Sequence, residues 1–282
     1  MMGLVGSTGL KQPNVSNHLA RLRESGIVVA RRAGRQVFYS LADPMVETLL
    51  DLALGHAERD DGLCADDLHC LAARFSQAIA DGDEVRARGV LSECLAGGVT
   101  LVSMMVDVVQ PAVSRLGALV EEGVLSIAEE HLATELTERL LARASQLYPP
   151  APRSGLVAVV GAVAGNWHTL GTRMIADLLA HAGWEALFLG ANVPTEDFAR
   201  LVAARRPHLV VISCMLAEHA DEARALIERL RAMRDGEAPD RLRIALGGRY
   251  VNENPGFAEA CGADLTAPDA RALLEQVAAA FA

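Results

Sequence analysis

Residues 156–171 read LVAVVGAVAGNWHTLG, an apolar run from Leu156 to Val163 followed by a polar turn and the start of a helix. Further strand-like apolar runs follow at 185–189, 209–213, 243–246 and 263–266. Amphipathic helical patterns separate them near 171–182, 195–205, 219–234, 256–261 and 268–281. Strands this apolar are buried on both faces, and their alternation with helices predicts a parallel sheet with right-handed crossovers. We therefore expect a five-stranded, doubly wound α/β domain over residues 155–282.

Three short groups of residues follow strands at one edge of this expected sheet. They are Asn166, His168 and Gly171 after the first strand, Ser213-Cys214-Met215 at the end of the third, and Gly247-Gly248 at the end of the fourth. Forty-one residues separate Gly171 from Ser213, and thirty-one separate Met215 from Gly247. Alone, a loop histidine is more often a surface or packing residue, and paired glycines usually form a turn. Together they predict a ligand site outside the carboxyl ends of the strands.

This spacing resembles the flavodoxin-like cobalamin-binding domain of methionine synthase, the mutases and corrinoid carriers, and the resemblance covers residues 155–282. It implies that His168 is the lower axial ligand of cobalt and that Ser213 meets the dimethylbenzimidazole tail of the cofactor. It also implies that Gly247 and Gly248 leave room for the tail and that Gly171 permits close backbone approach. Met215 replaces the leucine of the family with little change in volume.

Asn166 departs from the family pattern, which has an acidic residue that hydrogen-bonds the second ring nitrogen of the ligand histidine. A carboxylate raises the basicity of a ligating histidine, whereas a neutral amide can fix the tautomer but supplies no charge. We therefore expect His168 to ligate cobalt through a weaker and more pH-sensitive bond.

Residues 45–147 have continuous helical texture, interrupted at 81–83, 97–98 and 121–123, which predicts a bundle of about four helices. The stretch 116–134 resembles the helical cap of CarH- and LitR-type light-responsive repressors. The resemblance implies that Glu130 and His131 lie over the upper cobalt face, and that His131 can ligate cobalt after photolysis. Val120 replaces a tryptophan of that family, so the bound cofactor could be adenosyl-, methyl- or hydroxocobalamin. Without the downstream motif, a solvated charge cluster would explain Glu130 and His131 equally well.

The N-terminal region differs from the rest of the chain in charge. Residues 1–42 carry six basic residues against Glu24 alone, a net charge of +5, which leaves −15 on the remainder of a chain whose total is −10. Val15, Leu19 and Leu22 share one helical face, and Gly26 ends that helix. Two strand-like segments at 27–30 and 36–41 flank an arginine-rich tip. A helix followed by a basic hairpin is typical of winged helix-turn-helix domains.

The run from Gln12 to Leu19 resembles the recognition helix of ArsR-type repressors. The alternative is a solvated basic helix and hairpin. Only Met1 to Gly9 precede the motif, where a complete domain has a further helix or two. We therefore expect an N-terminally incomplete winged helix over residues 1–44. Either translation starts further upstream than Met1, or the domain has lost its first helix. The expected DNA contacts are Gln12, Asn14, Asn17 and Arg21 on base edges, and Arg31, Arg32 and Arg35 on phosphates or the minor groove.

Composition narrows the remaining classes. A hydrophobic content of 51% with 22% charged residues excludes a disordered chain, and no continuously apolar run reaches the length of a membrane span. The five cysteines are irregularly spaced with no signal peptide before them, which indicates a reducing cytoplasm without disulfides. Cys64 and Cys70 lack the second half of a structural zinc site, so we expect free, buried thiols there.

These observations predict a cytoplasmic, non-enzymatic, cobalamin-dependent transcriptional regulator that binds DNA as a homo-oligomer and responds to light or to cofactor supply. The alternative is a corrinoid carrier protein for methyl transfer with a vestigial DNA-binding head. A third reading is a corrinoid-free fold reused for protein contacts, because Asn166 replaces the family's acid.

Overall fold

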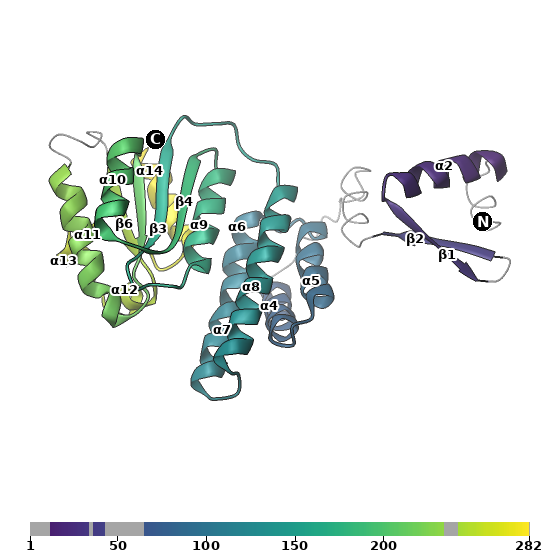
Figure 1. The fold of residues 1–282 in the computed structure, drawn as a ribbon, viewed down its shortest axis with the longest axis horizontal. Coiled ribbons are helices and arrows are strands. Elements are labelled where there is room, and N and C mark those ends of the chain that lie inside the picture. The colour runs from purple at the N-terminus through teal and green to yellow at the C-terminus, as the bar shows by residue number, and fades with distance from the viewer. Residues whose placement is uncertain (1–11, 34–35, 43–64, 234–241, 282) are drawn as a thin grey trace.

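The computed structural model of the chain describes residues 12–33, 36–42, 65–233 and 242–281, in the three groups of elements seen in Figure 1. The first group contains helix α2 (Gln12–Glu24) and the antiparallel hairpin β1 (Val28–Ala33) and β2 (Gln36–Leu41). Val15, Leu19 and Leu22 lie on one face of this helix, as predicted; Val15 and Leu19 are buried, and Leu22 is 37% exposed.

The wing also differs from the expectation. Arg31 and Arg32 belong to strand β1 and pair in register with Phe38 and Val37, so they do not lie in the connecting tip. Arg35, assigned to that tip, lies outside the described residues. The described arginines of the wing thus project from a strand whose backbone is fixed by the β1–β2 ladder.

The second group is a helical bundle, called here the cap. It contains α4 (Ala65–Ala80), α5 (Glu84–Ala96), α6 (Leu101–Ser103), the π-helical segment η1 (Met104–Val109), α7 (Gln110–Glu121), α8 (Ile127–Ala144) and the 3-10 turn η2 (Ser145–Leu147). The breaks expected at 81–83, 97–98 and 121–123 coincide with helix ends. Phe75, Met104 and Leu116 are completely buried between these helices. Cys70 is exposed, which corrects the expectation of a buried thiol, and Cys64 lies outside the described residues.

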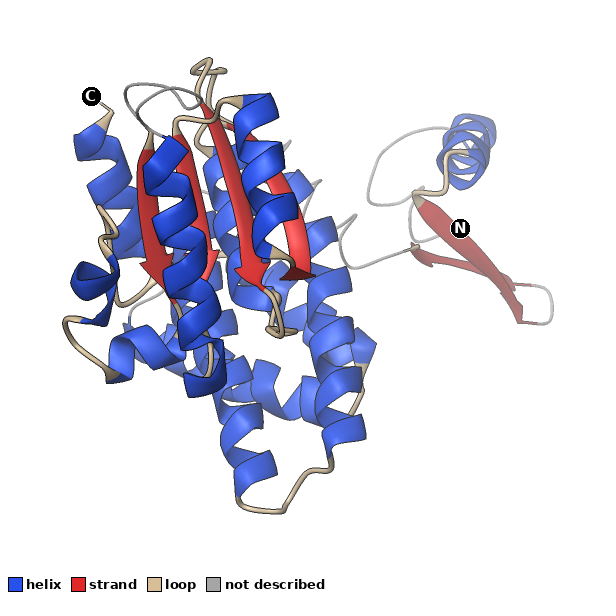
Figure 2. Cartoon of the chain, turned by 60° about the vertical axis from the view of Figure 1, so that its left-hand side comes forward, coloured by secondary structure: helices blue, strands red, loops and turns tan. Residues whose placement is uncertain are grey.

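The third group is a parallel sheet with helices on both faces (Figure 2). Its strands are β3 (Val157–Val163), β4 (Glu185–Val193), β5 (Leu209–Ser213) and β6 (Arg243–Gly247), in the order β4-β3-β5-β6. The fifth strand expected at 263–266 is reduced to an isolated parallel bridge between Leu265 and Ala245. The Asp264 carboxylate accepts the main-chain N–H of Ile244 at 2.7 Å, so a side chain replaces part of the ladder a longer strand would make.

Two sets of helices cover this sheet. Helices α10 (Thr195–Arg205), α11 (Ala220–Met233) and α13 (Phe257–Cys261) pack on one face, and α9 (Leu170–His181) and α14 (Ala270–Ala280) pack on the other. The short helices η3 (Ala217–His219) and α12 (Arg249–Glu253) follow β5 and β6. Leu170, Met174 and Leu178 of α9 belong to the same buried cluster as the cap. The cap is therefore joined to the sheet domain by a continuous apolar core.

Strand order reverses between β3 and β5, which are neighbours although β4 lies between them in sequence. The carboxyl ends of the strands point toward the end of the cap where α7 and α8 meet (Figure 2). Ligands of doubly wound domains bind at such a switch point. In the described part of the chain, no helix is long and apolar enough to cross a membrane.

Candidate functional site

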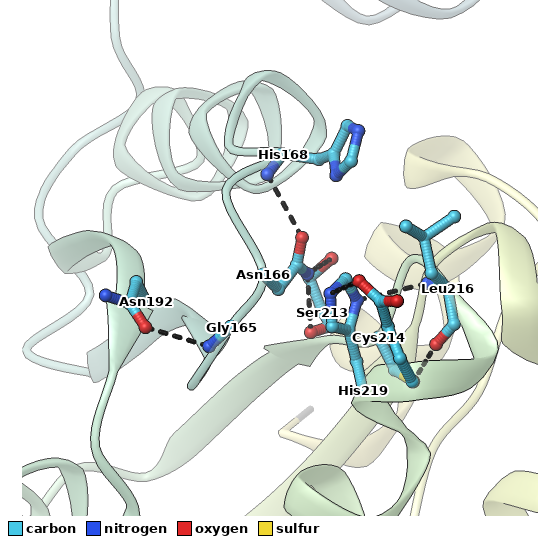
Figure 3. A network of polar contacts seen from close by, with 9 residues as sticks. Gly165, Asn166, His168, Asn192, Ser213, Cys214, Leu216 and His219 are labelled. Atoms are coloured by element: carbon cyan, nitrogen blue, oxygen red, sulfur yellow. Dashed lines mark hydrogen bonds and ion pairs between the residues drawn. The ribbon is translucent and has the colours of Figure 1, made fainter.

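Asn166 joins the first two sequence motifs at the switch point. It follows β3, is fully buried, and donates from Nδ2 to the main-chain oxygen of Ser213 at 3.1 Å and to Ser213 Oγ at 3.3 Å (Figure 3). Ser213 is the last residue of β5. Two side-chain hydrogen bonds therefore tie the loop that carries His168 to the end of the neighbouring strand.

The amide oxygen of Asn166 contacts the backbone of His168 and not its ring. Oδ1 accepts the main-chain N–H of His168 at 3.0 Å, and the imidazole points away from Asn166 (Figure 3). This differs from the expected contact with a ring nitrogen. The physical reason is that Nδ2 is occupied by Ser213, which turns Oδ1 toward the turn of the loop. Asn166 thus fixes the course of the loop and does not orient the imidazole.

Asn192 supports the same loop from β4. Its Oδ1 accepts the N–H of Gly165 at 2.8 Å, and its own N–H donates to the oxygen of Asn166 at 2.9 Å (Figure 3). Asn192 has a φ of +51°, a left-handed conformation that asparagine tolerates better than most residues. Asn192 was not among the predicted site residues, because the strand that carries it was expected to end at 189.

The surroundings of His168 lower the pKa of its imidazole. Partial desolvation lowers the pKa, the Glu130 carboxylate opposes that effect, and His219, Arg249 and His131 lower the pKa further. Both the start of α8 and the start of α12 thus act electrostatically on His168, and the net effect favours the neutral ring. A neutral imidazole has a free ring-nitrogen lone pair, which is the form that binds a metal.

The paired glycines follow different physical requirements. Gly248 has a φ of +117°, and a Cβ there would lie 2.3 Å from the main-chain oxygen of Cys214, so no other residue fits. A Cβ on Gly247 would meet no atom within 4 Å. Gly247 is the register partner of Ser213. The space beside Ser213 at the end of β6 is therefore unfilled by protein, and a side chain on Gly247 would enter it.

The cap provides the opposite wall. Ser126 and Glu129 form a capping box at the start of α8, where Glu129 Oε2 accepts the Ser126 N–H at 2.8 Å. Glu130 accepts a hydrogen bond from Thr134 Oγ1 at 2.9 Å and lies 3.7 Å from His131 Nε2. The His131 side chain is 72% exposed, and Val120 on α7 is half-buried. The Glu130–His131 pair is thus presented on an ordered helix end, accessible to a ligand.

Large apolar side chains are exposed on the segments that carry these residues. They are Val124 in the turn after α7, Ile127 at the start of α8, Trp167 beside His168, and Leu216 beyond Ser213. Gly171 and Met215 lie on the same loops, Gly171 exposed at the start of α9 and Met215 half-buried after β5.

His219 is a second histidine that sequence reasoning did not identify. It is 2% exposed, and its Nδ1 accepts the N–H of Leu216 at 3.1 Å, closing the turn after Ser213 (Figure 3). A Cβ on Gly165 would lie 3.7 Å from its ring, so it also packs beneath the His168 loop. No sequence spacing indicates this role, because it depends on the approach of two loops distant in sequence.

The residues predicted to contact DNA belong to the first group of elements, α2, β1 and β2, called here the head. Gln12, Asn14, Asn17 and Arg21 are all exposed on α2. Asn14, Asn17 and Arg21 lie opposite the buried Val15 and Leu19, whereas Gln12, the first residue of the helix, lies on the same side as Val15. Arg31 and Arg32 are exposed on β1. The helix therefore presents two amides and a guanidinium on the side away from its buried residues.

Comparison with known proteins assigns the two larger domains. Residues 156–278 match one family described as a B12 binding domain, and residues 71–144 match a second family with the same description. Both domains belong to the B12-binding families. Cobalamin is therefore the cofactor of the chain, and the B12-binding domains correspond to the sheet domain and the cap. Residues 3–29 match the bacterial regulatory protein, arsR family.

Relatives fall into two classes. The chain is 29% identical to the HTH-type transcriptional repressor CarH of Myxococcus xanthus over 251 residues, 87% of this chain and 77% of that protein. It is 25% identical to the trimethylamine corrinoid protein of Methanosarcina barkeri over 219 residues, 75% of this chain and 96% of that protein. These names describe a regulator and a corrinoid protein, in agreement with a chain that is not an enzyme.

Two further similarities concern single parts of the chain. A stretch of 55 residues, 20% of this chain, is 47% identical to the HTH-type transcriptional regulator NmtR of Mycobacterium tuberculosis and spans 46% of that protein. The monomethylamine corrinoid protein of Methanosarcina barkeri shares the fold of the B12-binding domains, with a TM-score of 0.64 at 18% identity over 75% of this chain and 98% of that chain.

Features of the site fit a corrinoid. The unfilled space at Gly247 can take a slender tail, the neutral His168 offers a nitrogen ligand, and the exposed apolar residues match the faces of a large macrocycle. Arg249 and Glu121, which join the two walls, were not identified from the sequence.

Proposed function

We propose that the chain is a cobalamin-responsive transcriptional regulator that binds DNA as a homo-oligomer in the cytoplasm. The proposed domains are a partial winged helix-turn-helix at 1–44, a cap at 45–147 and a cobalamin-binding domain at 155–282. One observation carries the proposal: a helix with an exposed polar face and a basic wing precede the B12-binding domains in the same chain. A corrinoid carrier has no use for such a head.

In the proposed complex, His168 would hold cobalt through its imidazole. Ser213 and the space at Gly247 would receive the dimethylbenzimidazole tail, and Gly248 lets the ends of β5 and β6 approach closely at Cys214. When bound, cobalamin would supply a cobalt–carbon bond. Asn166 holds the His168 loop against Ser213, Gly171 lets the backbone approach the cofactor, and Met215 lines the second loop.

Val120, Glu130 and His131 form the proposed upper wall. Their carboxylate and imidazole would contact the group that cobalamin carries on this side, and the exposed His131 imidazole would be available as a further cobalt ligand. Val120 leaves more space than a tryptophan, which accommodates an adenosyl or a methyl group. Because the start of α8 carries this pair, a change of upper ligand alters how the cap packs on the sheet domain.

The proposed regulation couples this packing to DNA. Helix-turn-helix proteins bind paired half-sites, so the spacing of two heads sets the affinity. A cap that changes position changes how subunits associate and how their heads are spaced, which links cofactor state to DNA binding. Gln12, Asn14, Asn17 and Arg21 read base edges in this scheme. Arg31, Arg32 and Arg35 hold the phosphates or the minor groove.

A second candidate function is supported by the corrinoid relatives, which align over nearly their whole length. In that case the chain carries a methyl group on cobalt between methyltransferases, and the head has no role. The two functions differ in whether the cofactor changes DNA affinity.

The proposal is tested by loading the full chain with adenosylcobalamin in the dark and following absorbance, elution volume and DNA retardation before and after illumination. A light-responsive regulator changes all three. A cofactor sensor changes elution and retardation on loading but not on illumination. Methyl- and hydroxocobalamin identify the upper ligand that is used. Retardation that is identical for the apo, dark and illuminated chain rules out both forms of regulation and favours the carrier.

A further inference from the structure

Arg249 directly follows the paired glycines and reaches across to the cap. Its Nη1 lies 3.1 Å from Glu121 Oε1 at the end of α7. Gly248 is the N-cap of α12, so the Arg249 side chain starts from the first residue of an ordered helix. The guanidinium thus forms a bridge between the third sequence motif and the cap.

Gly117 on α7 makes this bridge sterically feasible. A Cβ at Gly117 would lie 3.2 Å from Arg249 Nη2, so a larger residue would press against the guanidinium. Arg249 also acts electrostatically on His168, whose pKa it lowers. The bridge therefore joins the end of β6 to α7 and influences the proposed cobalt ligand.

A corrin placed between the sheet domain and the cap needs room on both faces. Nonbonded carbon atoms approach to about 3.5 to 4 Å, so a planar macrocycle separates its two walls by roughly twice that distance. Where Arg249 contacts Glu121, the walls are joined by a single ion pair. A macrocycle at that place requires the pair to separate.

We infer that the Arg249–Glu121 pair holds the cap against the sheet domain in the cofactor-free chain and separates when cobalamin enters. This inference rests on the placement of the corrin between His168 and the cap proposed above. It assigns Arg249 a role in cofactor access: the pair competes with the cofactor, so its removal increases cobalamin affinity.

The expected effect is modest. The side chains of Arg249 and Glu121 are 38% and 70% exposed, and exposed ion pairs are weak. Breaking the pair therefore costs the wild type about 1.5- to 5-fold in affinity. Because salt screens exposed charges, high ionic strength reduces the same penalty.

A second ion pair provides a matched control. Arg271 Nη2 on α14 lies 2.6 Å from Asp107 Oδ2 on η1, with side-chain exposures of 40% and 29%. This pair also joins the sheet domain to the cap, on the side where α14 residue Ala270 enters the cap core. It contacts none of the three motif loops, so its loss removes a bridge away from the proposed cobalamin site.

The test is a titration of the full chain with hydroxocobalamin, followed by absorbance at pH 8 in low and high salt. Arg249→Gln and Glu121→Gln are each expected to bind about 1.5- to 5-fold more tightly than wild type in low salt. The double variant is expected to match the single variants, and high salt is expected to tighten only the wild type. Arg271→Gln is expected to bind no more tightly than wild type.

Equal or weaker binding by both Arg249→Gln and Glu121→Gln overturns the inference, since the pair would then support the bound state. Tighter binding by Arg271→Gln as well would also overturn the inference, because loss of any bridge between the cap and the sheet domain would then raise cobalamin affinity. Thermal unfolding of each apo variant verifies folding, and Glu121→Gln gives the answer if Arg249→Gln does not fold. His168→Ala separately tests the corrin placement, because an unchanged bound spectrum would remove the premise. The titration measures cobalamin binding and not DNA binding, so its outcome is independent of whether the chain acts as a regulator.

Discussion

Replacing Asn166 by aspartate should weaken the apo fold and strengthen the bond to cobalt. The amide Nδ2 donates to the main-chain oxygen of Ser213 at 3.1 Å, a contact that an ionised carboxylate cannot make. The site is fully buried, so the carboxylate would face a carbonyl oxygen without solvent. Leaving a buried group unpaired costs about 1–3 kcal/mol, and more when it is charged. We expect Asn166→Asp to lower the free energy of unfolding of the apo chain by about that amount at neutral pH.

The effect should depend on pH with a definite sign. A protonated carboxyl can donate to the Ser213 oxygen, so burial raises its pKa in the folded state above the unfolded value of about 3.9. The unfolded chain then loses its proton first as pH rises. The stability of Asn166→Asp relative to wild type is therefore greatest below the unfolded pKa and declines as pH increases.

Asn192→Asp is the matched control. Asn192 uses its Oδ1 as an acceptor for Gly165, which a carboxylate reproduces, and aspartate also tolerates its left-handed backbone. Urea unfolding of the apo variants at pH 5 and pH 8 should show a larger loss at pH 8 for Asn166→Asp and little loss for Asn192→Asp. Equal losses at both positions would refute the assigned donor role of Nδ2.

In the cobalamin-bound chain, the direction reverses. A carboxylate near the ligand histidine raises its basicity, so His168 should release cobalt at a lower pH in Asn166→Asp than in wild type. Absorbance spectra recorded during acid titration of the bound protein measure this midpoint. A midpoint that moves upward or stays unchanged would show that position 166 acts only on the loop, as it does in the apo structure.

The paired glycines and the start of α8 give further predictions. Gly247→Ala should change the stability of the apo chain by no more than about 1 kcal/mol, because its Cβ meets no protein atom, but the same Cβ should reduce cobalamin affinity. Gly248→Ala should destabilise the apo chain, because its Cβ would lie 2.3 Å from the Cys214 main-chain oxygen. Melting curves and absorbance titrations distinguish the two variants, and equal melting temperatures would contradict the geometry. Ser126→Ala should cost about 1 kcal/mol by removing the cap of α8, measured by urea unfolding. The hydrogen bond from the Ser126 N–H lowers the pKa of Glu129. The ionised carboxylate therefore stabilises the fold above its ordinary pKa, and this stabilisation is lost as pH falls through the lowered pKa. Glu129→Gln should flatten the fall in the free energy of unfolding at acid pH, and an unchanged fall would contradict the assignment.

Most of the architecture follows from local patterns. Strand β5 spans 209–213 as predicted, because its apolar run is bounded by polar and proline-containing segments. Strand β4 was predicted to end at 189, but it continues to Val193 through Gly190, where irregular register with β3 accommodates a positive φ. This continuation places Asn192 beside the His168 loop. A glycine normally indicates a strand end, so the extension depends on pairing with β3 and not on local sequence.

The motif residues could be named from their spacing, but their partners could not. His168, Ser213 and Gly248 stand at fixed intervals along the chain. Arg249 and Glu121 are 128 residues apart and meet only because the cap docks on α9 and α14. Similarly, the hydrogen bonds of Asn166 to Ser213 turn the Asn166 side-chain oxygen away from the His168 ring. The sequence does not distinguish this orientation of the amide from the one that faces the ring.

The dependence of DNA affinity on cobalamin tests the proposed function most directly. Fluorescence anisotropy of a labelled operator fragment, titrated with the full chain at fixed salt, gives the dissociation constant of the apo chain and of the cobalamin-loaded chain. We expect the two constants to differ by at least about fivefold, as is typical of allosteric coupling, and the difference to disappear in His168→Ala. Equal constants for a chain whose spectrum confirms bound cobalamin would show that the head does not respond to the cofactor.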